Sequence, residues 1–226
     1  MKLFDGVKMN DSSVNKYNEL QNTNKHKVRL NKKALYLSYF TVLYNILEGL
    51  VSVFAGITAG SSALLGFGLD SFVESFSGGI MAWRFFRAGN SEKEDDEKEA
   101  LAIRLVAISF FIFGIYVLYE SVKKIYFLQI PQPTLVGIII AIVSIIVMPV
   151  LYYLKRETGK SVGSMSLVAD SRQTLTCVFL SFALLVGLGL NYLFGYWWAD
   201  PGIGIVIAGF LFKEGREAWI NKETCC

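Results

Sequence analysis

Two acidic residues stand out because they lie inside a stretch that is long and apolar enough to cross a lipid bilayer. The stretch runs from Ser62 to Trp83 and carries Asp70 and Glu74. Their spacing of four residues places both carboxylates on one face of a helix, about one turn apart. Acidic residues at membrane depth are costly and usually line an ion path, a proton relay or a water-filled cavity. The pair therefore predicts a functional site.

Two further apolar segments carry polar residues at helical spacing. In residues 34–59 the polar positions recur every three or four residues and are Thr41, Asn45, Glu48 and Ser52. In residues 166–194 one face carries Ser166, Asp170, Thr174, Cys177 and Ser181. Because polar faces avoid lipid, we expect these two faces to turn toward the face of Asp70 and Glu74.

Such packing would gather oxygen ligands into one cavity. The candidate metal-ligating residues are Asp70, Glu74, Asp170, Glu48, Asn45 and Thr174. A set made only of oxygen ligands suits hard and borderline divalent cations. Several carboxylates close together cannot all ionise in an empty site, so at least one should hold a proton. An arriving cation would displace that proton, which predicts cation/proton exchange.

Some of these acidic residues also have simpler interpretations. Glu48 can hydrogen-bond a neighbouring helix without binding a metal. Asp170 precedes the uninterrupted apolar run, so it can lie at the cytoplasmic interface, paired with Arg172 or with a loop lysine. Both alternatives stay open at this point.

The segments that must position these residues are apolar helices. The chain has 226 residues, of which 53% are hydrophobic and 18% charged, and its mean hydropathy is +0.44. Most of the apolar runs have the length that a helix needs to cross hydrocarbon, and the runs lie at residues 34–59, 62–83, 100–122, 134–154, 166–194 and 198–212. The predicted fold class is all-α, a polytopic membrane protein with six transmembrane helices. The six helices form one domain, residues 34–219, between a flexible polar tail, residues 1–33, and a short tail, residues 220–226.

The charges of the connections orient these helices. Lysine and arginine gather in the N-terminal tail, after residue 83, in a loop at Lys155, Arg156 and Lys160, and beyond residue 212, whereas the opposite side has only Lys123 and Lys124. The positive-inside rule then places both termini in the cytoplasm. Glu120 should pair with one of the two lysines that follow it. A charged linker is expected at residues 89–99, and no cleavable secretory signal is expected in the first 33 residues.

The sequence resembles a known family of membrane proteins. The strings NILEGLVSVFAGITAGSSALLGFGLDSFVES, LVADSRQTLTC and WWADPGIGIVIAGFLFKEGREAW are similar to those of the cation diffusion facilitator family. They look like its short branch, the transmembrane protein 163 type. The resemblance covers about residues 34–219. It implies a tetrahedral transport site built from two residues four apart on the second helix and two on the fifth.

The resemblance assigns ligands to this chain residue by residue. Asp70 and Glu74 match the second-helix pair, and Asp170 matches the first fifth-helix position. Thr174 stands where the family has aspartate, so the fourth ligand can instead come from Glu48 or Asn45. Zinc-selective members usually contribute a histidine, whereas the only histidine here, His26, lies in the N-terminal tail. Zinc, manganese, iron and cobalt therefore remain alternatives.

The resemblance and the residues together predict an efflux transporter for divalent transition metals, a cation/proton antiporter that works by alternating access. The alternatives are a non-transporting membrane protein of the same fold that binds metal or modulates a partner, and a passive channel. No nucleophile–base pair indicates an enzyme. The family's cytoplasmic metal-binding domain is not expected after Trp219, so a homodimer would form through the transmembrane helices. The expected partners are divalent metal ions, protons and membrane lipid, with no resident cofactor and no nucleic acid. The expected location is the plasma membrane, or the inner membrane of a bacterium.

Overall fold

The computed structural model describes residues 11–87, 92–132 and 134–221, and its regular structure is helical. The helices are α1 (Asp11–Ala59), α2 (Ser62–Arg87), α3 (Glu92–Tyr126), α4 (Leu135–Val162), α5 (Met165–Phe194) and α6 (Ala199–Asn221). No strand occurs within these ranges. The all-α prediction is confirmed, and each helix covers one of the six predicted apolar segments to within one residue. Cys225 and Cys226 lie outside the described residues.

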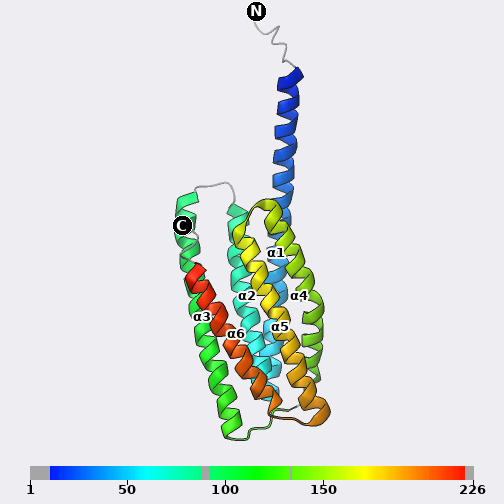
Figure 1. Ribbon diagram of the computed structural model, residues 1–226, viewed down its shortest axis with the longest axis vertical. Helices are drawn as coiled ribbons and strands as arrows, with labels where there is room; N and C mark the ends of the chain where they lie inside the picture. The colour runs from blue at the N-terminus through cyan, green and yellow to red at the C-terminus, as the bar shows by residue number, and fades with distance from the viewer. Residues whose placement is uncertain (1–10, 88–91, 133, 222–226) are drawn as a thin grey trace, which may run out of the picture.

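The helices stand side by side in one bundle, from which the first part of α1 projects (Figure 1). α1 packs mainly against α2, α4 against α5, and α3 against α6. Successive helices run in opposite directions along the bundle, so the start of α1 and the end of α6 point toward the same end. α2 contacts α1, α3, α5 and α6, and its residues therefore face the interior on several sides.

Three helices extend into stretches that the sequence predicts to be a tail, a linker or a loop. α1 begins at Asp11, so the tail predicted to be flexible is helical from that residue onward. α3 begins at Glu92, inside the predicted charged linker, and α4 continues to Val162 through the predicted loop. None of these polar stretches contains proline, and they are rich in good helix formers such as lysine and glutamate. Polarity marks where a helix leaves the apolar region, but it does not end the helix.

The turn between α1 and α2 depends on glycine. Gly60 has a φ angle of +62°, a left-handed conformation that glycine adopts without steric cost. Gly56 serves packing instead, because a Cβ atom there would lie 2.8 Å from the backbone nitrogen of Leu65. This close approach holds the ends of α1 and α2 together, so their polar residues meet along the rest of the interface.

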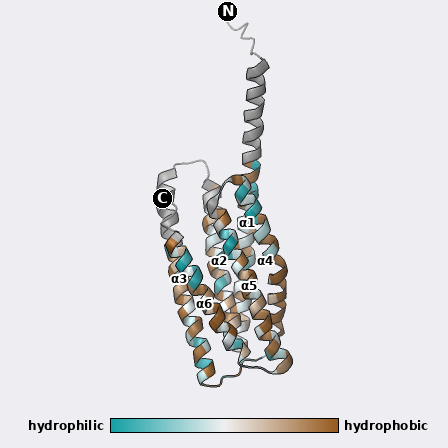
Figure 2. Cartoon of the chain, viewed as in Figure 1, coloured by the Kyte–Doolittle hydropathy of each residue, from teal (hydrophilic) through white to brown (hydrophobic). Residues whose placement is uncertain are grey.

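The distribution of hydrophobic residues is that of a protein surrounded by lipid. Large apolar side chains such as Phe54, Ile139 and Ile146 are more than half exposed, whereas many polar ones are buried. Hydrophobic residues predominate along α4 (Figure 2). Three segments are long and apolar enough to cross a membrane by length and composition, namely Val28–Ala59, Leu135–Val162 and Asp170–Phe194. A soluble domain rarely exposes so much contiguous apolar surface.

Candidate functional site

The acidic pair of α2 faces the interior of the bundle. Asp70 is 4% exposed and Glu74 is 1% exposed. α2 approaches α1 closely because Gly68 lies against it, where a Cβ atom would be 2.9 Å from the backbone nitrogen of Val53. The small residues on α2 thus allow the helix to carry two carboxylates inside a tightly packed interface.

Glu74 is held by residues of two other helices. The hydroxyl of Thr174, on α5, donates a hydrogen bond to Glu74 Oε1 at a distance of 2.5 Å. The same hydroxyl accepts a hydrogen bond from Lys155 Nζ, on α4, at 2.7 Å. Lys155 Nζ also lies 3.4 Å from Glu74 Oε1 and 3.0 Å from Asp170 Oδ2. We call Glu74, Asp170, Thr174 and Lys155 the carboxylate–lysine cluster.

Asp170 is fixed on both of its oxygens. Ser77 of α2 donates a hydrogen bond to Asp170 Oδ1 at 2.8 Å, while Oδ2 faces the ammonium of Lys155. Asp170 is only 5% exposed, so it does not sit at a solvated interface. The simpler interpretation, a salt bridge between Asp170 and a loop lysine, is correct in that the partner is a lysine. It is wrong about the position of that lysine, because Lys155 lies within α4 and not in a loop.

Lys155 is the residue that sequence reasoning missed. It was predicted to lie in a cytoplasmic loop, but α4 continues for almost two turns beyond it and its side chain is 0% exposed. The signal was the spacing of the inward face of α4, whose buried positions are Gly137, Ala141, Ser144, Met148, Leu151, Lys155, Thr158 and Gly159. Steps of three and four residues along this face lead from the apolar segment directly to the lysine.

Glu48 of α1 is hydrogen-bonded within α1 and to α2, and not to the carboxylate–lysine cluster. Tyr44 donates a hydrogen bond to Glu48 Oε1 at 3.0 Å, and Ser71 donates one to Glu48 Oε2 at 2.9 Å. This agrees with the hydrogen-bonding interpretation of Glu48. Asn45 is fully buried, and neither its amide nitrogen nor its amide oxygen has a hydrogen-bond partner among the described residues. A buried amide without partners is costly and unusual.

The predicted ligands are therefore all buried, yet they do not form one shared cage in this structure. Among the described residues, no three histidine, cysteine, aspartate or glutamate side chains are grouped so that they could hold a metal ion. Asp70 lies beside Cys177 of α5, within electrostatic reach of Glu74 and Glu48. Glu74 Oε2 accepts no hydrogen bond from the described residues. The place between Glu74 and Asp170 is taken by the lysine ammonium.

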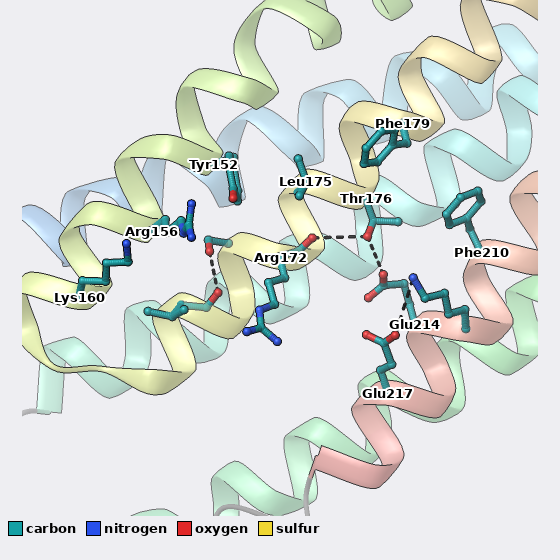
Figure 3. A pocket seen from close by; sticks show the side chains of 13 residues that line it. Tyr152, Arg156, Lys160, Arg172, Leu175, Thr176, Phe179, Phe210, Glu214 and Glu217 are labelled. Atoms are coloured by element: carbon teal, nitrogen blue, oxygen red, sulfur yellow. Dashed lines mark hydrogen bonds and ion pairs between the residues drawn. The ribbon is translucent and has the colours of Figure 1, made fainter.

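A pocket of about 700 Å³ opens between α4, α5 and α6, beside this cluster. Its lining includes Arg156 of α4, Arg172 and Thr176 of α5, and Glu214 and Glu217 of α6. Thr176 donates a hydrogen bond to Glu214 at 2.7 Å, linking α5 to α6 across the pocket (Figure 3). Glu214 also acts electrostatically on Asp70, so the pocket brings an acidic residue near the buried pair.

Comparison with known proteins covers most of the chain. Residues 38–221 match the family model described as the cation efflux transmembrane domain. Transmembrane protein 163 of Xenopus laevis is 21% identical over 81% of this chain and 65% of its own length. Protein p34 of Rickettsia prowazekii is 26% identical, over 82% and 62%. The cation-efflux pump FieF of Shewanella oneidensis is 24% identical, over 73% and 57%. The chain spans less than two thirds of the length of these relatives.

Proposed function

Because this chain belongs to the family of cation efflux transmembrane domains, we propose that it is a membrane transporter that exports divalent transition-metal cations. The resemblance to the cation diffusion facilitators is confirmed by the family match, which contains all six predicted ligands. The chain is an integral membrane protein. The name of its Shewanella relative, a cation-efflux pump, supports outward movement of the cation.

The proposed topology has six membrane crossings with both termini in the cytoplasm. The alternating directions of the helices support it, because α1 begins and α6 ends at the same end of the bundle (Figure 1). That end also carries exposed basic residues such as Arg156, Lys160 and Lys213, as the positive-inside rule expects of a cytoplasmic face. Glu120 is paired with Lys123 at 3.2 Å, as the sequence predicts for the opposite side.

The observation that carries the proposal is the buried acidic face shared by α2 and α5. Asp70, Glu74 and Asp170 are each no more than 5% exposed, and lipid-embedded proteins retain buried carboxylates mainly along ion paths. Their oxygens suit zinc, manganese, iron(II) or cobalt. A transported metal would be bound at this face, with the site open first to the cytoplasm and then to the other side of the membrane. Protons would return on the same carboxylates, since a carboxylate binds either a proton or a metal.

A second candidate is a protein of the same fold that does not transport. The position of Lys155 favours it, because the ammonium already pairs with both Glu74 and Asp170. Such a protein would keep the helical bundle and its buried ion pairs without exchanging cations. The two candidates differ in whether a metal ion can enter the carboxylate–lysine cluster.

The test is metal-driven proton movement in proteoliposomes, with zinc, manganese, iron(II) and cobalt added separately. Wild-type protein should take up at least one metal with an opposing proton flux. Asp70→Asn should reduce the flux at least tenfold, since even outer-shell changes alter metal affinity by roughly 10- to 100-fold. Glu120→Gln is the matched control, because this carboxylate pairs with Lys123 away from the buried face, and its flux should equal that of wild type.

Two results would contradict the proposal. An unchanged flux in Asp70→Asn would show that the acidic face of α2 is not the transport site. Absence of flux for all four metals in correctly folded wild-type protein would exclude transport of these metals and favour the non-transporting candidate.

A further inference from the structure

The proposed exchange of metal and protons gives Lys155 no role, although this lysine lies at the centre of the proposed site. Fully buried lysines are rare unless they are paired. The ammonium of Lys155 lies 3.4 Å from Glu74 on α2 and 3.0 Å from Asp170 on α5. It therefore contacts one oxygen of each carboxylate, and the two carboxylates come from two different helices.

We propose that Lys155 is a resident counter-ion, an inference that rests on the proposed function. Its ammonium occupies the cation position between Glu74 and Asp170, and an incoming divalent metal must displace it. The ammonium and a metal ion would use the same oxygens. Because both are cations, electrostatic repulsion prevents them from occupying this position together. The lysine is thus a competitor that is built into the chain.

The structure offers a place for the displaced ammonium. Thr158 lies on the same inward face of α4, about one turn closer to the end of the helix, and is 2% exposed. Its hydroxyl has no hydrogen-bond partner among the described residues. Arg156 and Lys160 are already exposed on this part of α4. The four-carbon stem of lysine allows its ammonium to move toward such a polar end while the stem stays buried.

Charge makes the competition selective. Glu74 and Asp170 together carry two negative charges when ionised, and the ammonium supplies one positive charge. A divalent ion that replaces the ammonium adds one further positive charge and neutralises the pair. A monovalent ion brings only the charge that the ammonium already provides, so it gains no electrostatic advantage by displacing the ammonium. Lys155 therefore discriminates against monovalent cations and weakens the binding of divalent ones.

The experiment is isothermal titration of the purified full chain with zinc and, separately, manganese ions, in choline buffer and in potassium buffer. Lys155→Met removes the ammonium and keeps an unbranched side chain. Its Kd for the bound metal should fall at least tenfold below that of wild type, within the roughly 5- to 150-fold range of typical site couplings. Potassium should weaken metal binding in Lys155→Met but not in wild type. Lys123→Met removes the lysine that pairs with Glu120, away from the cluster, and should behave as wild type.

A folded Lys155→Met protein that binds metal as weakly as wild type, or more weakly, would overturn the inference and leave the lysine as a structural ion pair. If that variant does not fold, Lys155→Gln, which keeps a polar group for Thr174, must show the same gain for the inference to stand. Metal binding that appears only in the lysine variants would support the resident counter-ion and count against transport by the wild type. Absence of zinc and manganese binding in all folded variants would overturn this inference, whereas the proposed function would fall only if the proteoliposome experiment also showed no flux for any of the four metals.

Discussion

The buried contact between Lys155 and Glu74 predicts an energetic coupling that can be measured in the metal-free protein. Glu74→Gln removes one of the two carboxylates that face the ammonium and leaves Asp170 as its remaining ionic partner. Lys155→Met leaves two buried carboxylates facing each other without a cation. Removing one partner of a buried ion pair costs about 3–5 kcal/mol. Because each partner here keeps other contacts, we expect each single substitution to lower the free energy of unfolding by about 2–4 kcal/mol.

The double variant Glu74→Gln/Lys155→Met removes both charges together. Its destabilisation should be smaller than the sum of the two single effects by about 1–3 kcal/mol, the range found for residues in direct contact. The measurement is equilibrium unfolding of chelator-treated protein in one lipid or detergent system at one pH. A parallel cycle that pairs Lys155→Met with Glu120→Gln is the control, because Glu120 contacts Lys123 instead, and the effects should add to within about 0.5 kcal/mol.

Additive effects in the Glu74–Lys155 cycle would refute the reasoning. They would mean that the ammonium does not interact with Glu74 in solution, despite the separation of 3.4 Å. A coupling in the control cycle as large as that in the test cycle would refute it as well, because the effect would then reflect general damage to the bundle and not the ion pair.

Two structural contacts outside the cluster give further predictions, both measured as thermal unfolding midpoints. Asp200 is fully buried and accepts hydrogen bonds from the Ser61 hydroxyl and from the Ser62 backbone amide at the start of α2. Asp200→Asn should therefore destabilise the fold by about 1–3 kcal/mol. An unchanged midpoint would show that these hydrogen bonds to the start of α2 are not needed for stability. Gly56→Val should destabilise the α1–α2 interface by about 1–3 kcal/mol or more because of the approach to Leu65, whereas Gly209→Ala, whose Cβ atom would meet nothing within 4 Å, should leave the midpoint unchanged or slightly raised.

The sequence predicted the positions of the helices well, because the central part of each helix is a long run of apolar residues. Their ends were less predictable. The chain leaves the apolar region near Ala34 and near Leu154, yet α1 and α4 extend beyond these points through polar residues. Helix propensity and hydropathy are independent properties of a residue: lysine and glutamate are polar and still favour helix. A boundary that is read from hydropathy therefore gives the edge of the apolar region and not the end of the helix.

The polar faces were predictable, but the contacts between them were not. Periodicity placed Asn45, Glu48, Asp70, Asp170 and Thr174 on inward faces, and all of them are buried. Which residues meet depends on the rotation and relative height of the helices, and these are set by packing contacts. Glu48 is an example, because its partners are Tyr44, one turn away on α1, and Ser71, which is 23 residues away in the sequence.

Thr174 and Lys155 are best explained together, as two parts of one charge balance. Thr174 stands where the family resemblance implies an aspartate, so the cluster has one acidic ligand fewer than the resemblance implies. The structure shows that its hydroxyl accepts a hydrogen bond from Lys155 and donates one to Glu74, which a carboxylate could do only when protonated. A neutral hydroxyl beside the ammonium keeps the cluster at two carboxylates, Glu74 and Asp170, so that one lysine offsets half of their charge. The loss of one acidic ligand and the presence of a buried lysine thus have the same consequence, because both weaken the hold of the cluster on any added cation. A transporter must release its cargo as well as bind it, and a site weakened in this way by its own side chains would favour release.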